Sequence, residues 1–270
     1  MRPFFENNVL QQQPFKPMII VVDTTKAGSA SNTFVLPIVK AVTEVVKIYW
    51  GDGTNSTGVN GNNTHVYAAS GIYTVKIESR LFGGIYFNNL GDKAKITKIA
   101  NYGQGVSRLN ISSFYGCSSL LSIDIGNIVS NGTDATSQYR GCTALTTVPL
   151  FNLSKVTNAY AMFAYCPVTT VPLFNLSNCT STRSMFSLCS SLTTVPLLNL
   201  SNCTNAINMF SGVTLTTQSY SDFLINLATL PLQSGVGFHG GNSKYNPAAA
   251  IARAYLISNF GWTITDGGAA

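Results

Sequence analysis

The sequence contains few charged residues for its length. Asp, Glu, Lys and Arg together make up 10% of the 270 residues, whereas about a quarter is usual for a soluble domain. Histidine occurs twice and glutamate three times, and in residues 135–221 the only charged side chains are Arg140, Lys155 and Arg183. The net charge of +6 therefore has no clustered basic face, which argues against a nucleic-acid partner. The shortage of acid–base side chains argues against an enzyme.

Long hydrophobic runs are also missing. The longest apolar stretch near the start is residues 18–22, far short of the roughly 20 residues that cross a bilayer, so no membrane contact is expected. Glu6 lies where a signal peptide has its apolar core, which predicts synthesis in a cytoplasm without export. Apolar residues still make up 45% of the chain, which indicates a folded protein.

An internal repeat dominates the second half of the chain. The sequence Thr-Thr-Val-Pro-Leu follows a cysteine three times, at Cys142, Cys166 and Cys189. An aromatic residue precedes each of these cysteines by three positions, and degenerate flanking copies extend the aromatic column to Phe114, Tyr139, Phe163, Phe186 and Phe210. The steps of 25, 24, 23 and 24 residues fall within the range of roughly 20 to 29 that leucine-rich repeats show.

Each copy predicts one strand and one return segment. Residues 145–148 are β-prone and are stopped by Pro149, which cannot donate to a ladder. We expect these runs to stack as a parallel sheet along one face. The return segment at residues 157–162 is expected to form one capped helical turn and to point its Met-Phe pair inward. Stacked neighbours then complete the core that one copy cannot bury alone.

Such an array needs two ends. We expect an N-terminal cap near residues 96–113 and a C-terminal cap from Tyr220 onward. Pro247 starts a predicted helix within that second cap. Its apolar stripe is predicted to seal the array, with a partner helix as the alternative; the stripe consists of Ile251, Tyr255 and Ile257 or Phe260.

All six cysteines occupy repeat positions. One column holds Cys117, Cys142, Cys166 and Cys189, and a second holds Cys179 and Cys203 where the first full copy has Val156. A position that accepts valine is small and apolar, so we predict reduced, buried thiols; disulfides between stacked copies are the alternative. Metal binding is not expected, because the sequence has no Cys-x-x-Cys pair and no histidine near these cysteines.

These residues resemble the BspA-like leucine-rich repeats, over roughly residues 96–268. The carriers are Phe114-Tyr-Gly-Cys117, the Met-Phe pairs at 162–163, 185–186 and 209–210, and the Leu-Thr-Thr-Val-Pro-Leu runs. Residues 251–268 are similar to the tail that follows such repeats in many phage-encoded proteins. The resemblance implies adhesion and display without catalysis. Members of that family on bacterial surfaces carry a signal peptide and a cell-wall anchor; we expect neither in this chain, which argues against a bacterial surface role.

Residues 17 to about 90 have a different pattern. Short apolar or alternating runs at residues 18–22, 33–36, 45–50 and 71–77 are separated by Gly, Ser and Asn clusters, which is typical of a β-sandwich. Trp50-Gly-Asp-Gly-Thr54, followed by His65-Val-Tyr67, resembles the PKD domain, an immunoglobulin-like module. In that pattern Asp52 closes a tight turn through backbone amides, with His65 and Tyr67 packed beside it; the alternative is that Asp52 helps to hold a cation.

Sequence signals for a phosphate-binding loop or for a hydrolase active site are weak. The glycine-rich run at residues 235–241 lacks the lysine of a phosphate-binding loop, and His239 within it is expected to cap a turn more readily than to contact a ligand. A glycosidase needs two carboxylates roughly 5 to 10 Å apart; Asp222 and Asp266 lie in the C-terminal cap, but nothing near them in the sequence indicates a pair tuned for catalysis. No G-x-S-x-G nucleophile motif occurs. We therefore predict no catalytic, cofactor-binding or metal site.

The sequence as a whole predicts a mainly β protein with an immunoglobulin-like (PKD-like) sandwich, a short leucine-rich-repeat solenoid and an α-helical C-terminal cap. The expected divisions are an extended arm at residues 1–16, the sandwich at 17–92, the solenoid at 93–219 and the cap at 220–270.

The predicted function is that of a non-enzymatic accessory virion protein of a tailed phage, made in the host cytoplasm, which decorates the capsid or displays a surface. Its expected partners are capsid or other virion proteins, bound through the arm and the sandwich, and a host glycan or protein, bound weakly and multivalently through the repeats. A homo-oligomer is compatible with the sequence; nucleic acid, membrane and cofactors are not expected. The alternatives are a bacterial or protist cell-surface adhesin and a polysaccharide-degrading enzyme, since PKD modules accompany such enzymes.

Overall fold

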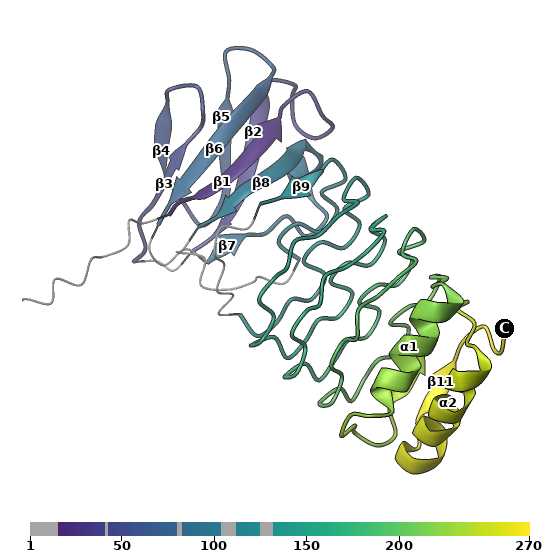
Figure 1. Ribbon diagram of the computed structural model, residues 1–270. Helices are drawn as coiled ribbons and strands as arrows, with labels where there is room; N and C mark the ends of the chain where they lie inside the picture. Colours follow the sequence, from purple (N-terminus) through teal and green to yellow (C-terminus); the bar gives the residue numbers. More distant parts are fainter. Residues whose placement is uncertain (1–15, 41–42, 80–82, 104–111, 125–131) are drawn as a thin grey trace, which may run out of the picture.

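The structure is a computed structural model that describes residues 16–40, 43–79, 83–103, 112–124 and 132–270. Within these ranges the protein is mainly β, with eleven short strands and two α-helices. The strands of the N-terminal part lie at one end, the helices lie at the other, and a stack of coils connects them (Figure 1). The predicted arm, residues 1–16, lies outside the described residues except for Lys16.

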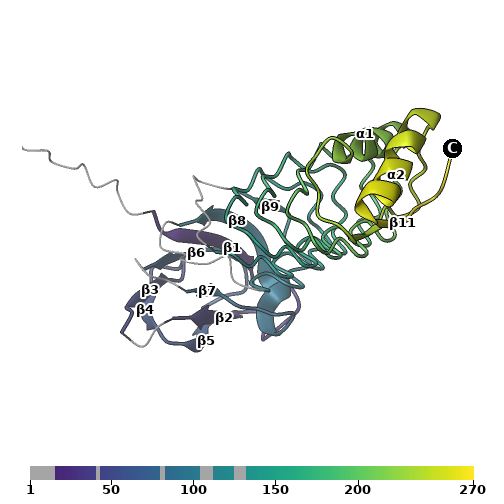
Figure 2. The ribbon, with the colours of Figure 1, turned by 90° about the horizontal axis from the view of Figure 1, so that it is seen from below.

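Two β-sheets build the N-terminal part and form two layers (Figure 2). The larger sheet has the order β4-β3-β6-β1-β8-β9, and the smaller one has the order β5-β2-β7. The strands are β1 (Met18–Asp23), β2 (Thr33–Val39), β3 (Val46–Tyr49), β4 (Asn55–Gly58), β5 (Gly61–Val66), β6 (Ile72–Glu78), β7 (Gly84–Ile85), β8 (Ile96–Tyr102) and β9 (Ser122–Ile123). The four runs expected from the sequence are confirmed as β1, β2, β3 and β6.

Both layers contribute alternate side chains to one hydrophobic core. Along β1 and β2, every second residue is buried, as the period of two in a strand requires when one face is covered. The buried residues of these two strands are Met18, Ile20 and Val22 in β1, and Phe34, Leu36 and Ile38 in β2. The same core continues without interruption into the repeats.

Strand β8 joins the two halves of the molecule. It pairs antiparallel with β1 and parallel with β9, and β9 lies in the degenerate first copy of the repeat. Tyr102 at the end of β8 meets Phe114 edge-on at 6.0 Å, and its hydroxyl is hydrogen-bonded to that of Tyr139. The large sheet therefore leads directly into the stack, and residues 96–102, expected to cap the repeats, are a strand of the front sheet.

The copies stack in register. Parallel bridges connect Asp134 to Asn158, Asn158 to Ser181, and Ser181 to Asn205, which confirms the predicted period. The rings of the aromatic column stack at centroid distances of 5.7 to 5.9 Å. The Met-Phe pairs are buried as predicted, and so are all members of both cysteine columns. We number the copies one to five by their aromatic residue, from Phe114 to Phe210.

The predicted parallel sheet of Leu-Thr-Thr-Val runs is wrong. Residues 145–150, and the equivalent segments 168–173 and 192–197, are extended without being strands. Adjacent segments are linked by a single backbone hydrogen bond, such as that from Thr169 N to Thr146 O at 3.3 Å. A second rung cannot form at Pro149 or Pro172, because proline has no amide hydrogen to donate.

The denser ladder runs instead through the turn segments, residues 112–117, 137–142, 161–166, 184–189 and 208–213. Every second backbone amide donates to a carbonyl of the next copy, as Phe163 N does to Met185 O at 3.0 Å. The amides in between donate within their own copy and close turns, as Ala164 N does to Ala161 O at 3.2 Å. The capped helical turn expected at residues 157–162 is therefore wrong, because every second amide is directed to the next copy.

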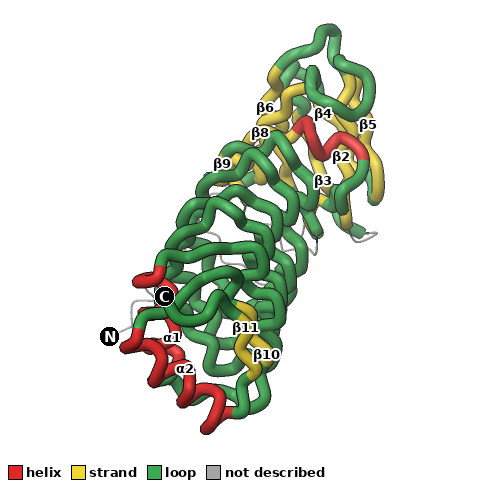
Figure 3. The backbone as a smooth tube through the Cα atoms, turned by 90° about the vertical axis from the view of Figure 1, so that its right-hand side faces the viewer, coloured by secondary structure: helices red, strands yellow, loops and turns green. Residues whose placement is uncertain are grey.

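Two helices and two strands close the C-terminal end. They are α1 (Thr217–Leu227), β10 (Gly237–His239), α2 (Pro247–Phe260) and β11 (Thr263–Thr265). The helices lie on one side of the stack, and β10 and β11, which pair in parallel, lie on the other (Figure 3). Because Ala206 bridges to Phe238, the cap consists of two further coils in which helices replace the extended segments.

The sealing stripe predicted for α2 is wrong except at Phe260, which is partly buried and packs against the core. Ile251 is 78% exposed, and Tyr255 and Ile257 are also exposed, whereas the buried residues of the helix are Ala249, Ala252 and Leu256. The buried set also follows helical spacing, at i, i+3 and i+7. Two of its three members are alanines, whose small side chains let α2 pack close to its neighbours.

Candidate functional site

Two cation–π groups lie on or beside the turn segments, and together we call them the tyrosine–arginine face. One consists of Tyr115, Arg140 and Tyr165, and the other of Tyr160 and Arg183. The guanidinium of Arg140 lies between two rings, 5.2 Å from the centroid of Tyr115 and 5.3 Å from that of Tyr165. Arg183 lies 5.7 Å from the ring centroid of Tyr160 in the preceding copy. Such cation–π contacts fix the planes of the guanidinium groups.

The backbone conformation at Tyr165 is unusual for a tyrosine. The position two residues after the column aromatic has a left-handed backbone in all five copies, and its occupants are Gly116, Gly141, Tyr165, Leu188 and Gly212. Outside glycine, this conformation costs about 1 kcal/mol or more. Copy three nevertheless has a large side chain there, 46% exposed. Strain that is retained at an exposed aromatic residue points to a functional surface.

The two arginines have no salt-bridge partner within the described ranges. Among the described residues neither Arg140 nor Arg183 forms an ion pair, and the nearby carboxylate of Asp134 accepts hydrogen bonds from Thr136 N and Asn158 Nδ2 instead. The Nε of Arg140 is buried and has no hydrogen-bond acceptor in the described part of the chain. A guanidinium held in this way can bind a carboxylate through two parallel hydrogen bonds, while the tyrosine rings offer flat apolar faces.

No local sequence pattern marks this face. Along the chain, Arg140 and Arg183 are isolated charges, and the tyrosines that contact them lie 23 to 25 residues away. Aligning the copies would have revealed the signal, because Tyr165 and Leu188 interrupt a column that is otherwise glycine.

The two carboxylates considered for glycoside hydrolysis have different surroundings. Asp222 lies at a groove of about 620 Å³ between the extended segment of copy four and α1, which Leu197 and Ile225 also line. Its carboxylate accepts a hydrogen bond from Gln218 at 2.8 Å. The side chain of Asp266 is only 2% exposed and bonds to Arg253 and Tyr220. The structure therefore gives Asp266 a stabilising role in the cap.

The glycine-rich run forms β10 and the turn after it. His239 Nδ1 accepts a hydrogen bond from Gly241 N at 3.0 Å, so the histidine stabilises its own turn, as expected. A Cβ on Gly241 would lie 2.1 Å from Val213 O. Glycine at position 241 therefore allows the chain to pass close to copy five. This steric requirement explains the glycine, so a phosphate-binding role is not needed to account for it.

Asp52 closes the turn after β3, as predicted. One carboxylate oxygen accepts from Thr54 N at 3.0 Å and from Thr54 Oγ1 at 2.6 Å, and the other lies 2.7 Å from His65 Nε2. His65 stacks on Trp50 at 4.8 Å and meets Tyr67 edge-on at 4.5 Å. Burial acts to raise the pKa of Asp52, but hydrogen bonds from Thr54 and His65 outweigh it and hold that pKa at about 2.

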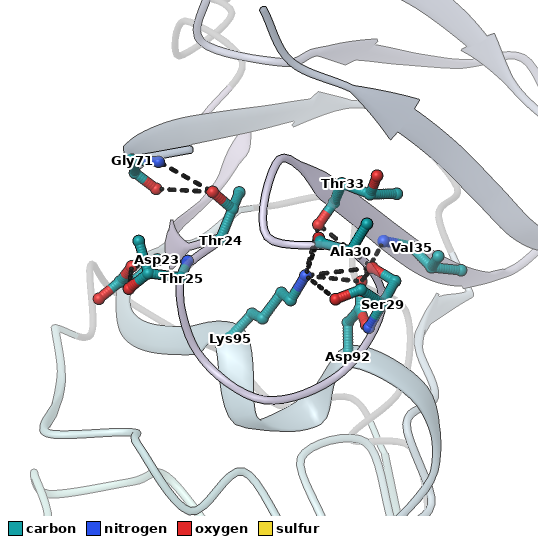
Figure 4. Close-up of polar contacts among 10 residues, drawn as sticks. All are labelled: Asp23, Thr24, Thr25, Ser29, Ala30, Thr33, Val35, Gly71, Asp92 and Lys95. Atoms are coloured by element: carbon teal, nitrogen blue, oxygen red, sulfur yellow. Dashed lines mark hydrogen bonds and ion pairs between the residues drawn. The ribbon is translucent and has the colours of Figure 1, made fainter. Parts of the chain in front are cut away.

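A buried ionic clamp in the front part was not anticipated from the sequence (Figure 4). Both charges come from the 3₁₀ helix η1 (Gly91–Lys95). The fully buried ammonium of Lys95 donates to the backbone oxygens of Ser29, Ala30 and Thr33 at 2.6 to 3.0 Å. The carboxylate of Asp92 accepts from Ser29 N, Ser29 Oγ and Val35 N. The clamp holds the loop before β2 against η1 and has no exposed surface for chemistry.

The cysteines are free and buried. Thiols of the main column donate to the carbonyl of the aromatic residue in the preceding copy, as Cys166 does to Tyr139 O at 3.0 Å and Cys189 to Phe163 O at 3.1 Å. Burial raises the pKa of Cys189, and it raises that of Cys179 to about 12. Neutral thiols of this kind are poor nucleophiles, so a structural role accounts for them.

The described residues contain no group of three His, Cys, Asp or Glu side chains placed to hold a metal ion. In the same part of the chain, neither helix has the length and apolarity needed to cross a membrane. Comparisons with protein-family models, curated proteins and solved structures gave no match. The geometry of the chain itself is therefore the basis for assigning its function.

Proposed function

We propose that this protein is a non-enzymatic accessory protein of a tailed-phage virion, which decorates the capsid and displays a surface for weak adhesion. The proposal takes the two facing sheets as an immunoglobulin-like sandwich of the PKD type. It takes the stacked copies as a BspA-like leucine-rich-repeat solenoid. Synthesis in the host cytoplasm and incorporation into the particle are part of it.

The observation that carries the proposal is the division between the inside and the outside of the stack. Its rings and thiols are buried, and the exposed positions of its extended segments are Thr and Leu, without any charge. A surface of this composition supports contact and not catalysis. Because the copies repeat one arrangement, several weak contacts act together, and their avidity compensates for low affinity at a single site.

Attachment to the particle is assigned to the opposite end. The repeats extend away from the two sheets, so a protein held through the sheets and residues 1–16 presents its repeats outward. Capsid or other virion proteins are the partners at that end, and a host glycan or protein is the partner of the repeats. A homo-oligomer on the particle would multiply these contacts.

Mass spectrometry of purified virions tests the proposal. The protein is expected at a constant ratio to the major capsid protein, and its absence from intact particles would refute the assignment. Deleting residues 1–16 is expected to abolish incorporation while the soluble protein keeps its unfolding transition. Unchanged incorporation of that variant would refute the anchoring role of the arm.

The second candidate is a cell-surface adhesin of a bacterium or protist, since the same repeat surface supports it. Surface labelling of intact producing cells distinguishes the two. An adhesin is labelled on cells and is absent from particles, whereas a virion protein shows the opposite distribution.

A further inference from the structure

We propose that the tyrosine–arginine face binds a linear acidic polysaccharide, with its carboxylates on Arg140 and Arg183 and its sugar rings against Tyr165 and Tyr160. The inference deepens the proposed adhesive function and rests on it. It names the chemical class of the ligand and the residues that recognise it.

The charge of the ligand follows from the arginines. The carboxylate of Asp134 in the same stack accepts hydrogen bonds from other groups, and the two arginines lack salt-bridge partners among the described residues. The buried Nε of Arg140 has no acceptor there either. Contacts with the rings of Tyr115 and Tyr165 restrain the guanidinium of Arg140 before any ligand arrives. Less side-chain freedom is then lost on binding, and a carboxylate matches the two parallel donors of the guanidinium.

The polymeric nature of the ligand follows from the spacing. Arg140 belongs to copy two and Arg183 to copy four, and stacking steps of 5.7 and 5.9 Å separate the coils that carry them. Two arginines on coils that are not adjacent offer two separate positions for a carboxylate. A chain with charges at regular intervals can occupy both, and joining the two contacts raises the overall affinity.

The sugar rings follow from the tyrosines. Tyr165 is 46% exposed, at a position where the left-handed backbone favours glycine and where three of the five copies have it. An aromatic ring presents a negative face to the weakly positive C–H groups of a pyranose. A nucleic acid needs a denser basic surface than two arginines supply, and an acidic peptide has no ring to match Tyr165.

The direct test measures binding of the full chain to polygalacturonate, a linear polymer of uronic acid, by biolayer interferometry at 0.15 M salt. Two other polymers serve as comparisons. Fully methyl-esterified polygalacturonate keeps the rings and loses the charges, and poly-glutamate keeps the charges and loses the rings. We expect both to bind at least tenfold more weakly than polygalacturonate. Equal binding of poly-glutamate would overturn the sugar part of the proposal, and equal binding of the ester would overturn the carboxylate part.

Variants locate the site. The double substitution Arg140→Gln/Arg183→Gln is expected to weaken polygalacturonate binding at least tenfold. The matched control Lys47→Gln/Lys244→Gln removes the same charge from exposed positions outside the repeats and is expected to change binding less than twofold. Equal losses in the two double variants would show attraction to the net charge alone and would overturn the site.

Tyr165→Gly separates binding from folding. Glycine removes the strain of the left-handed backbone, but it also raises the conformational entropy of the unfolded chain. Because these two effects oppose each other, the midpoint of thermal unfolding is expected to stay within about 3 °C. Binding is expected to fall at least fivefold. Leu188→Gly makes the same backbone change in copy four without removing a ring and is expected to keep binding within twofold. Unchanged binding of Tyr165→Gly would overturn the role of the ring. None of these measurements uses particles, so failure of this inference is distinguishable from absence of the protein from virions.

Discussion

Replacing Phe163 by alanine tests the stacked core most directly. The side chain has no exposed surface, and its ring lies 5.7 to 6.2 Å from those of Tyr139, Phe151, Phe174 and Phe186. Truncating a buried phenylalanine costs about 3 to 5 kcal/mol in total. Because four ring contacts are lost, each favourable in addition to area burial, Phe163→Ala is expected at the upper end of this range.

Urea unfolding followed by circular dichroism and by tryptophan fluorescence measures this change in the free energy of unfolding. Leu173→Ala is the matched control, because Leu173 belongs to the neighbouring extended segment and is 60% exposed; its cost is expected below about 1 kcal/mol. A cost below about 1 kcal/mol for Phe163→Ala, or an equal cost for both variants, would show that the aromatic column does not form the core.

Further outcomes test other parts of the structure. Lys95→Met leaves the buried carboxylate of Asp92 without its cation and is expected to destabilise the protein by about 3 to 5 kcal/mol in urea unfolding; a loss below about 1 kcal/mol would refute the clamp. Because the pKa of Asp52 is about 2 against a reference value of 3.8, its stabilisation is complete above about pH 4 and is lost as the pH falls to about 2. Asp52→Asn should therefore lower the unfolding midpoint at pH 7 but hardly at pH 2, and an equal effect at both would contradict this assignment. Gly241→Ala, whose Cβ would overlap backbone oxygens, is expected to destabilise the cap by more than 2 kcal/mol, whereas Gly268→Ala, with open space around it, is expected to cost about 1 kcal/mol from its positive φ alone. All six thiols should resist Ellman's reagent in the native protein and react in denaturant, and rapid reaction of any of them in the native state would contradict their burial.

Periodic features could be predicted from the sequence, because many positions contribute to one signal. The aromatic and cysteine columns and the period of the copies depend on repeated residues, and the structure buries them as expected. The front strands alternate with a period of two and were found for the same reason. The turn at Asp52 follows from a local Gly-Asp-Gly sequence whose carboxylate reaches its own neighbouring backbone.

Features that depend on distant contacts were missed. The bonds from Lys95 to Ala30 and Thr33 join residues far apart in the sequence, and no local pattern marks them. In α2, apolar residues occur on all sides, so periodicity did not distinguish Ile251 from Ala252. Ala252 is buried and Ile251 is exposed, because the side of α2 that faces the rest of the cap has room for only a small side chain at this position. Tyr165 was missed because its significance appears only when the copies are compared position by position.

The ladder of the turn segments has a mechanical consequence. Each coil is hydrogen-bonded to the coil before it and the coil after it, so tension applied at the C-terminus acts on one interface at a time. The helical end is expected to peel off first, followed by single coils in order, each releasing roughly 80 Å of chain at about 3.3 to 3.6 Å per residue. Under steady tension the stack is therefore expected to lengthen in steps, while the coils nearer to the two sheets stay folded.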